Sequence, residues 1–165
     1  MKKLVWLVML VSLLSADEYR EEISEGLFSQ GQKNFGFVVG ASSGYGEDYT
    51  VVGANINYFV IDNLSMGLGY QGWFGGDPSI HEFNIPITYY YPYSDNYHPY
   101  FGAMYKHTFI DAPYEDYNVY GGRIGLAMQA GGSSYISFGW VQEYRDYGKK
   151  SESEGYPEIS MGIVF

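Results

Sequence analysis

From Lys33 onward, apolar and polar residues alternate in short segments that turn residues separate. A β-strand sends successive side chains to opposite faces, so this alternation predicts strands with one apolar and one polar face. Repeated segments of about ten alternating residues are typical of transmembrane β-barrels. The sequence therefore predicts an all-β fold, an eight-stranded antiparallel up-and-down transmembrane β-barrel. Its strands are expected at 33–43, 49–60, 64–74, 80–91, 97–109, 117–129, 135–145 and 156–165.

A soluble barrel with its apolar face inward would show the same alternation. Its outer face would then be dense in Lys, Glu and Asp, whereas the polar face here is mostly Gly, Ser, Asn and Thr with isolated charges. Aromatic residues also end the apolar face toward both rims, as in membrane girdles. They are Tyr58, Tyr89, Tyr91 and Tyr135 at one rim, and Phe74, Phe109, Tyr144 and Tyr147 at the other.

The connections between the predicted strands alternate in length. Those after the second, fourth and sixth strands have about three residues, and the others are longer or more charged, with the longest near 146–155. Short periplasmic turns and longer outer loops place both termini in the periplasm. Within the fourth segment, Pro86 faces away from the lipid and predicts a bulge or a lost ladder bond.

Three regions divide the chain. Residues 1–16 have a basic start, an apolar stretch and a small-residue end, which predicts a secretory signal peptide. Residues 17–32 are acidic, and the spacing of Tyr19, Ile23 and Leu27 fits a short helix in a periplasmic N-terminal segment. Residues 33–165 form the predicted barrel.

Composition narrows the possible functions. Without residues 1–16, seven basic residues face 19 acidic ones, a net charge of −12 that argues against nucleic acid. The chain has no Cys, which excludes disulfides, lipoprotein anchoring and thiolate metal sites. The 22 Gly and 19 Tyr fit an aromatic-girdled barrel. The Gly-x-Gly-x-x-Gly stretch at 67–72 lacks the following helix of a dinucleotide site, and we expect no cofactor or metal.

The chain resembles the small eight-stranded outer-membrane barrels, the family of the outer-membrane protein A-like transmembrane domain and the opacity and protein X-like proteins. The alternating segments and a last strand that ends on Phe165 carry this resemblance. It implies a Gram-negative outer membrane, contact with outer-membrane lipids and lipopolysaccharide, and a monomer. It also implies that the outer-membrane assembly machinery reads the last strand through Ile159, Met161, Ile163 and Phe165.

Five charged residues occupy the polar face of five successive predicted strands. An eight-stranded barrel is only wide enough for its own side chains, so they predict a static polar core that fills the lumen. The predicted turns place Glu143 nearly opposite Glu158, with Arg123 one pair away as their shared cation. A gate of exchanging salt bridges is the alternative, which the resemblance to the protein A barrel implies. This lumen charge cluster consists of Glu82, Lys106, Arg123, Glu143 and Glu158.

His81 and His107 share the lipid-facing parity and lie near the predicted outer rim. A His–Ser–acid triad needs mutual hydrogen-bond reach, and the residue two beyond His107 is Phe109 rather than a hydroxyl. We interpret both as interfacial imidazoles near lipopolysaccharide phosphates. The sequence thus predicts a non-enzymatic barrel with a structural or surface-interaction role. A narrow small-solute channel, porin-like, is the alternative, and a lipid A-modifying enzyme is the third.

Overall fold

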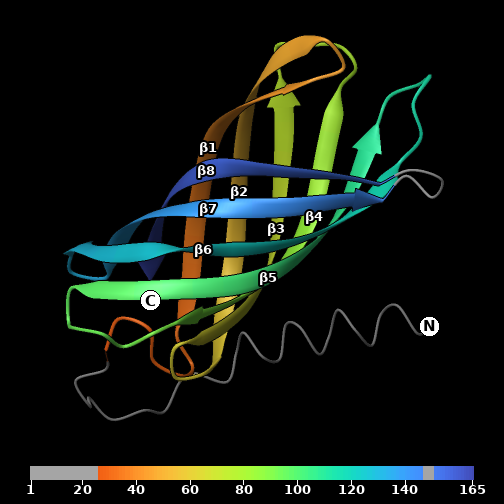
Figure 1. Cartoon of the computed structure of the whole chain (residues 1–165). Helices are drawn as coiled ribbons and strands as arrows, with labels where there is room; N and C mark the ends of the chain where they lie inside the picture. Colours follow the sequence, from red (N-terminus) through yellow and green to blue (C-terminus); the bar gives the residue numbers. More distant parts are fainter. Residues whose placement is uncertain (1–25, 147–150) are drawn as a thin grey trace, which may run out of the picture.

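The computed structural model describes residues 26–146 and 151–165, and it shows an eight-stranded antiparallel barrel (Figure 1). Each strand pairs with the next along the chain, and β1 pairs with β8 to close the ring. No helix in these two ranges is long and apolar enough to cross a membrane. The strands are β1 (Lys33–Gly44), β2 (Glu47–Ile61), β3 (Leu64–Phe74), β4 (Ile80–Tyr90), β5 (Tyr97–Ile110), β6 (Tyr117–Gly131), β7 (Ser134–Asp146) and β8 (Ser151–Val164).

The predicted fold class and number of strands are confirmed, but the connection lengths are partly wrong. The connection after β1 has only two residues, Tyr45 and Gly46, whose φ angles of 55° and 85° suit a tight hairpin turn. The connection after β4 has six residues, 91–96, rather than three. β8 begins at Ser151, so most of the stretch expected as the longest loop is strand. Residues 1–25 and 147–150, with the predicted signal peptide, most of the predicted helix and Tyr147, lie outside the described residues. Leu27, the last residue of the helix pattern, is described and lies in a turn.

The barrel has two distinguishable ends. The termini end carries residues 26–32, Phe165 and the connections 62–63, 91–96 and 132–133. The loop end carries the connections 45–46, 75–79 and 111–116. The backbone amide and carbonyl groups of Lys33 and Phe165 exchange two hydrogen bonds of 2.8 Å, which anchors the last residue beside the start of β1.

An apolar belt covers the outside of the barrel, as the alternation predicts. Phe37 on β1, Phe101 on β5 and Ile124 on β6 are 47%, 58% and 64% exposed. Contiguous exposed apolar surface of this extent is rare on soluble monomers and suits contact with lipid.

The expected place of Tyr135 in the outer aromatic girdle is wrong. Its neighbour Ile136 faces outward, so Tyr135 must face the lumen, where it is buried. Its hydroxyl oxygen accepts a hydrogen bond of 2.6 Å from the side-chain amide of Asn34.

Pro86 interrupts the pairing of β4 with β3, as predicted. Ile87 pairs with Met66 and Asn84 pairs with Gly69, but the residues between them have no registered partner across this edge. Pro86 still has a partner on the other side, where it pairs with Met104 of β5. A proline without an N–H group removes one ladder bond while the rest of the strand holds.

Phe28 closes the lumen at the termini end. Phe28 is 2% exposed, and its ring stacks on Tyr90 with centroids 4.1 Å apart. The Tyr135 ring lies nearly perpendicular to it, with centroids 5.4 Å apart. The carbonyl oxygen of Phe28 accepts a hydrogen bond of 2.7 Å from the amide of Asn63, which fixes the segment to the β2–β3 turn. The cluster around Phe28 consists of Phe59, Tyr90, Tyr100, Ala127, Tyr135 and Val164.

We predict that Phe28→Ala lowers the free energy of unfolding by about 3–5 kcal/mol, because it empties the centre of a packed aromatic cluster. Urea titration of the refolded protein, followed by gel mobility without boiling, measures the change. Phe138→Ala is the matched control, since Phe138 is 46% exposed on the belt. Equal losses for the two variants would contradict a plug at Phe28.

Candidate functional site in the barrel lumen

Lys106 lies at the centre of a buried ion network in the lumen. Glu82 on β4, Lys106 on β5 and Glu143 on β7 are only 1%, 3% and 2% exposed. The Lys106 ammonium donates a hydrogen bond to Glu143 Oε1 and lies 3.6 Å from Glu82 Oε2. One cation thus balances two carboxylates that burial would otherwise make very costly.

Neutral donors complete the environment of Glu82. Thr108 Oγ1 donates to Glu82 Oε1 at 3.1 Å, and Trp73 Nε1 donates to Oε2 at 3.3 Å. The side-chain amide of Gln71 donates a third hydrogen bond to Oε2. A buried carboxylate with donors on both oxygens is held in one orientation.

Glu143 connects the network to a second cation. The Tyr156 hydroxyl donates to Glu143 Oε1 at 2.6 Å, and Arg145 lies 3.7 Å from Oε2. Arg145 also forms an ion pair of 2.6 Å with Glu154, whose side chain is 38% exposed. The network therefore runs from the buried core toward the loop end.

Arg123 and Glu158 form a separate pair. The Arg123 guanidinium donates to Glu158 Oε1 and lies 5.1 Å from the centroid of the Tyr100 ring. The expectation that Glu143 lies opposite Glu158 is wrong. Glu143 pairs with Glu154, and Glu158 pairs with Gly139, because β8 begins earlier than expected and its register is displaced by four residues.

The structure thus divides the predicted charge cluster into two groups and adds members that the sequence analysis missed. Arg145 has the same inward parity as Glu143, so alternation alone could have identified it. Neutral donors such as Gln71 and Thr108 carry no signal of their own until a neighbouring carboxylate is located. The missed residues are Gln71, Trp73, Thr108, Arg145, Glu154 and Tyr156.

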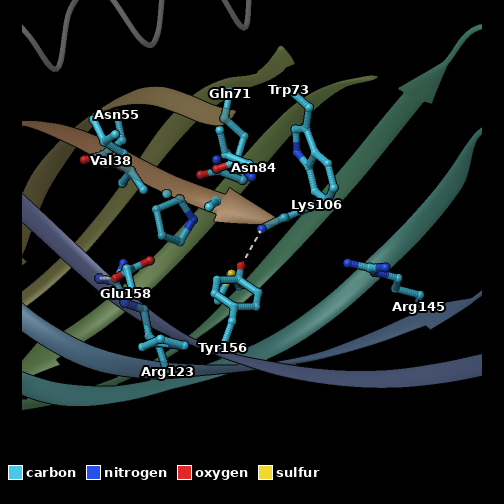
Figure 2. Close-up of a pocket in the computed structure, with 17 residues that line it drawn as sticks. Val38, Asn55, Gln71, Trp73, Asn84, Lys106, Arg123, Arg145, Tyr156 and Glu158 are labelled. Atoms are coloured by element: carbon cyan, nitrogen blue, oxygen red, sulfur yellow. Dashed lines mark hydrogen bonds and ion pairs between the residues drawn. The ribbon is translucent and has the colours of Figure 1, made fainter. Parts of the chain in front are cut away.

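A cavity of about 80 Å³ lies between the two groups (Figure 2). Lys106 points across it toward the Tyr156 hydroxyl, to which its ammonium donates a hydrogen bond of 3.2 Å. Arg123 and Glu158 lie together on one side, and Arg145 lies on the other. Glu82 and Glu143 do not line the cavity, so among the described residues Glu158 is its one carboxylate beside three cations.

An apolar cluster fills the lumen at the loop end. The Tyr49 and Trp73 rings meet with centroids 5.5 Å apart, and the Tyr49 hydroxyl donates to the carbonyl oxygen of Pro78 at 3.2 Å. The lumen is therefore layered, with an apolar cluster at each end and the ion groups between them. This loop-end cluster consists of Tyr49, Val51, Trp73, Ile80 and Ile110.

His81 and His107 face outward toward the loop end on neighbouring strands. His81 pairs with Phe109 and Phe83 pairs with His107, so the two imidazoles are diagonal neighbours. His81 Nδ1 lies 2.8 Å from the Tyr70 hydroxyl, and His107 Nδ1 lies 2.9 Å from Asn118 Oδ1. Within residues 26–146 and 151–165, no group of acidic or His side chains is arranged to hold a metal ion.

The last strand presents its apolar residues to the outside. Phe165 follows β8 and pairs with Lys33 at the termini end. The four residues predicted as an assembly signal, Ile159, Met161, Ile163 and Phe165, are 57%, 57%, 54% and 65% exposed.

Comparison with solved structures identifies the fold. The N-terminal β-barrel domain of Pseudomonas aeruginosa OprF superposes with a TM-score of 0.64 at 15% identity, covering 82% of this chain and 98% of that domain. The fold is that of small outer-membrane barrels. Neisserial surface protein A (NspA) gives a TM-score of 0.57 at 16% identity, with 81% of this chain and 94% of that chain covered. No protein-family model matches the sequence, and no curated protein matches it.

We predict that Lys106→Met costs about 3–5 kcal/mol of stability, because it leaves the Glu82 and Glu143 carboxylates buried without their shared cation. Adding Glu82→Gln and Glu143→Gln to this variant restores most of the lost stability, since no unpaired charge then remains.

We predict that Arg123→Ala removes the paired cation of Glu158 alone. Its cost in stability therefore adds to that of Lys106→Met within about 0.5 kcal/mol. Urea unfolding of the single and combined variants measures these terms, and strong non-additivity would show one network instead of two.

Proposed function

We propose that the protein is a non-enzymatic, structural β-barrel protein of the outer membrane, and that its lumen does not conduct ions along the barrel axis. The observation that carries this proposal is the three-layer filling of the lumen, in which Phe28 seals one end and Trp73 lies in the cluster at the other. The Lys106 network between them has its carboxylates held by several donors, which favours a static core over an exchanging gate.

The apolar belt and the exposed last strand support the membrane location. We propose that the belt contacts outer-membrane lipids and lipopolysaccharide, that the assembly machinery reads the strand ending at Phe165, and that the barrel is a monomer with both termini in the periplasm. His81 and His107 then lie at the depth of the outer leaflet headgroups, where an imidazole hydrogen-bonded to a Tyr or Asn is compatible with an interface. The role this supports is envelope integrity or surface contact through the loop end.

We predict that the refolded protein shows no steady ohmic conductance in planar bilayers at high salt. Phe28→Ala alone also stays silent, because the ion network and the loop-end cluster still block the axis. A variant that adds Trp73→Ala, Glu82→Ala, Lys106→Ala and Glu143→Ala opens all three layers and conducts, provided that its gel mobility shows a folded barrel. A regular open state in the unaltered protein would favour the narrow-channel alternative.

We predict that labelling of single introduced cysteines reports the orientation of the barrel in the outer membrane. The chain has no native Cys that would also react. Pro113→Cys in the 111–116 connection reacts with a membrane-impermeant maleimide on intact cells, because the loop end faces outward. Asp95→Cys in the 91–96 connection reacts only after the outer membrane is permeabilised. The opposite pattern would place the termini outside and overturn the proposed orientation.

A further inference from the structure

The barrel wall is incomplete on one side, between β1 and β8. Their pairing covers only Asn34 to Val38 of β1 with Ser160 to Val164 of β8. β1 remains paired with β2 up to Gly44, and β8 remains paired with β7 down to Ser151. Among the described residues, 39–44 and 151–159 thus each have a strand partner on one side only, and Figure 1 shows β1 and β8 diverging there. This stretch is called the seam opening below.

The hydrogen-bond pattern shows which backbone groups face the seam opening. Lys33 and Phe165 exchange both of their backbone hydrogen bonds, and in an antiparallel pair such residues recur at every second position. Continuing this register would bring Val39 opposite Ile159 and Ala41 opposite Pro157. Pro157 has no N–H to donate, so the continued ladder would lack one hydrogen bond at this point.

The seam opening leads to the cavity in the lumen. Val39 and Ala41 line the cavity from β1, and Pro157 lines it from β8. Lys106 and Arg123 line it from within the lumen (Figure 2). Arg123 Nε is buried and has no hydrogen-bond partner among the described residues. A buried guanidinium N–H without an acceptor is costly, and an anionic oxygen is the partner that suits it best.

We propose that this cavity binds the carboxylate head of a single-chain amphiphile that enters from the membrane through the seam opening. Arg123 and Lys106 provide the charge, and the backbone amides of Val39 and Ala41 provide further donors. The acyl chain stays outside, along the apolar lips of the opening, where Val39 is 64% and Ile159 is 57% exposed.

Size and surroundings decide between this ligand and others. A water molecule needs about 10–15 Å³ of cavity volume. A cavity of about 80 Å³ therefore admits a carboxylate with its first carbons but not a phosphorylated sugar. Backbone groups that face lipid must find partners. A carboxylate supplies acceptors for the amides of Val39 and Ala41, which have no β8 partner among the described residues. The proposal rests on the membrane location proposed above but not on a lumen that is closed along its axis.

The test is titration of carboxyl-¹³C laurate into nanodiscs that carry the refolded chain, with the bound carboxyl resonance as readout. We expect a saturable resonance that empty nanodiscs lack. Arg123→Gln weakens binding at least about 10-fold, the loss of one charge-assisted hydrogen bond. Glu158→Gln tightens binding, because it removes the carboxylate that competes for Arg123. If both variants weaken binding equally, the effect is structural and the proposal is wrong.

Three controls separate the source and the route of the ligand. Acetate that displaces laurate at equal concentration would indicate a free anion from water, and dodecanol that binds equally well would indicate a tail site; either result overturns the proposal. Oxidised Val39→Cys/Ile159→Cys closes the seam opening and abolishes binding, whereas oxidised Phe37→Cys/Met161→Cys, in the paired stretch, leaves it unchanged. Equal binding to both cross-linked forms would exclude the seam as the route. These outcomes are independent of the conductance measurement.

Discussion

The constraint on which this structure depends is that backbone amide and carbonyl groups in a membrane must be satisfied within the protein, and a ring of paired strands does so. Seven of the eight strand junctions meet this condition over most of their length, even where Pro86 removes one ladder bond. The eighth junction, between β1 and β8, meets it only near the termini end. The most unusual feature of the barrel is therefore a local departure from the rule that stabilises the rest.

Polar groups inside the barrel also need hydrogen-bond partners. Strands with apolar side chains on the outer face point polar side chains into the lumen, and a narrow lumen leaves little room for water to solvate their charges. Each buried carboxylate is consequently held by a cation and by neutral donors, as Glu82 is by Lys106, Thr108 and Gln71. Among the described residues, Arg123 Nε and His98 Nδ1 are buried side-chain nitrogen atoms without a hydrogen-bond partner. Arg123 lines the same cavity as Val39, Ala41 and Pro157 of the incomplete β1–β8 junction.

The sequence predicted much of this fold because alternation is a strictly local signal. Strand number, lipid-facing parity and the break at Pro86 all follow from neighbouring residues. The pairing of the charges did not follow, since cross-strand register depends on where each hairpin turns, and an error of a few residues at the start of β8 moved Glu143 from Glu158 to Glu154. The parity error at Tyr135 arose at a strand end, where one position decides the face. Phe28 could not be predicted, because a single aromatic residue in an acidic segment gives no indication that it folds back into the lumen.

Pro157 lies in β8 beside the incomplete junction with β1. In the sequence it is one proline in an acidic, glycine-containing stretch, and it fits a loop as well as a strand end. In the barrel it stands where β8 would donate to Ala41, so its missing N–H and its ring coincide with the place where the wall parts. Pro157 thus lies in the part of β8 that has no β1 partner among the described residues, and it lines the cavity behind that part.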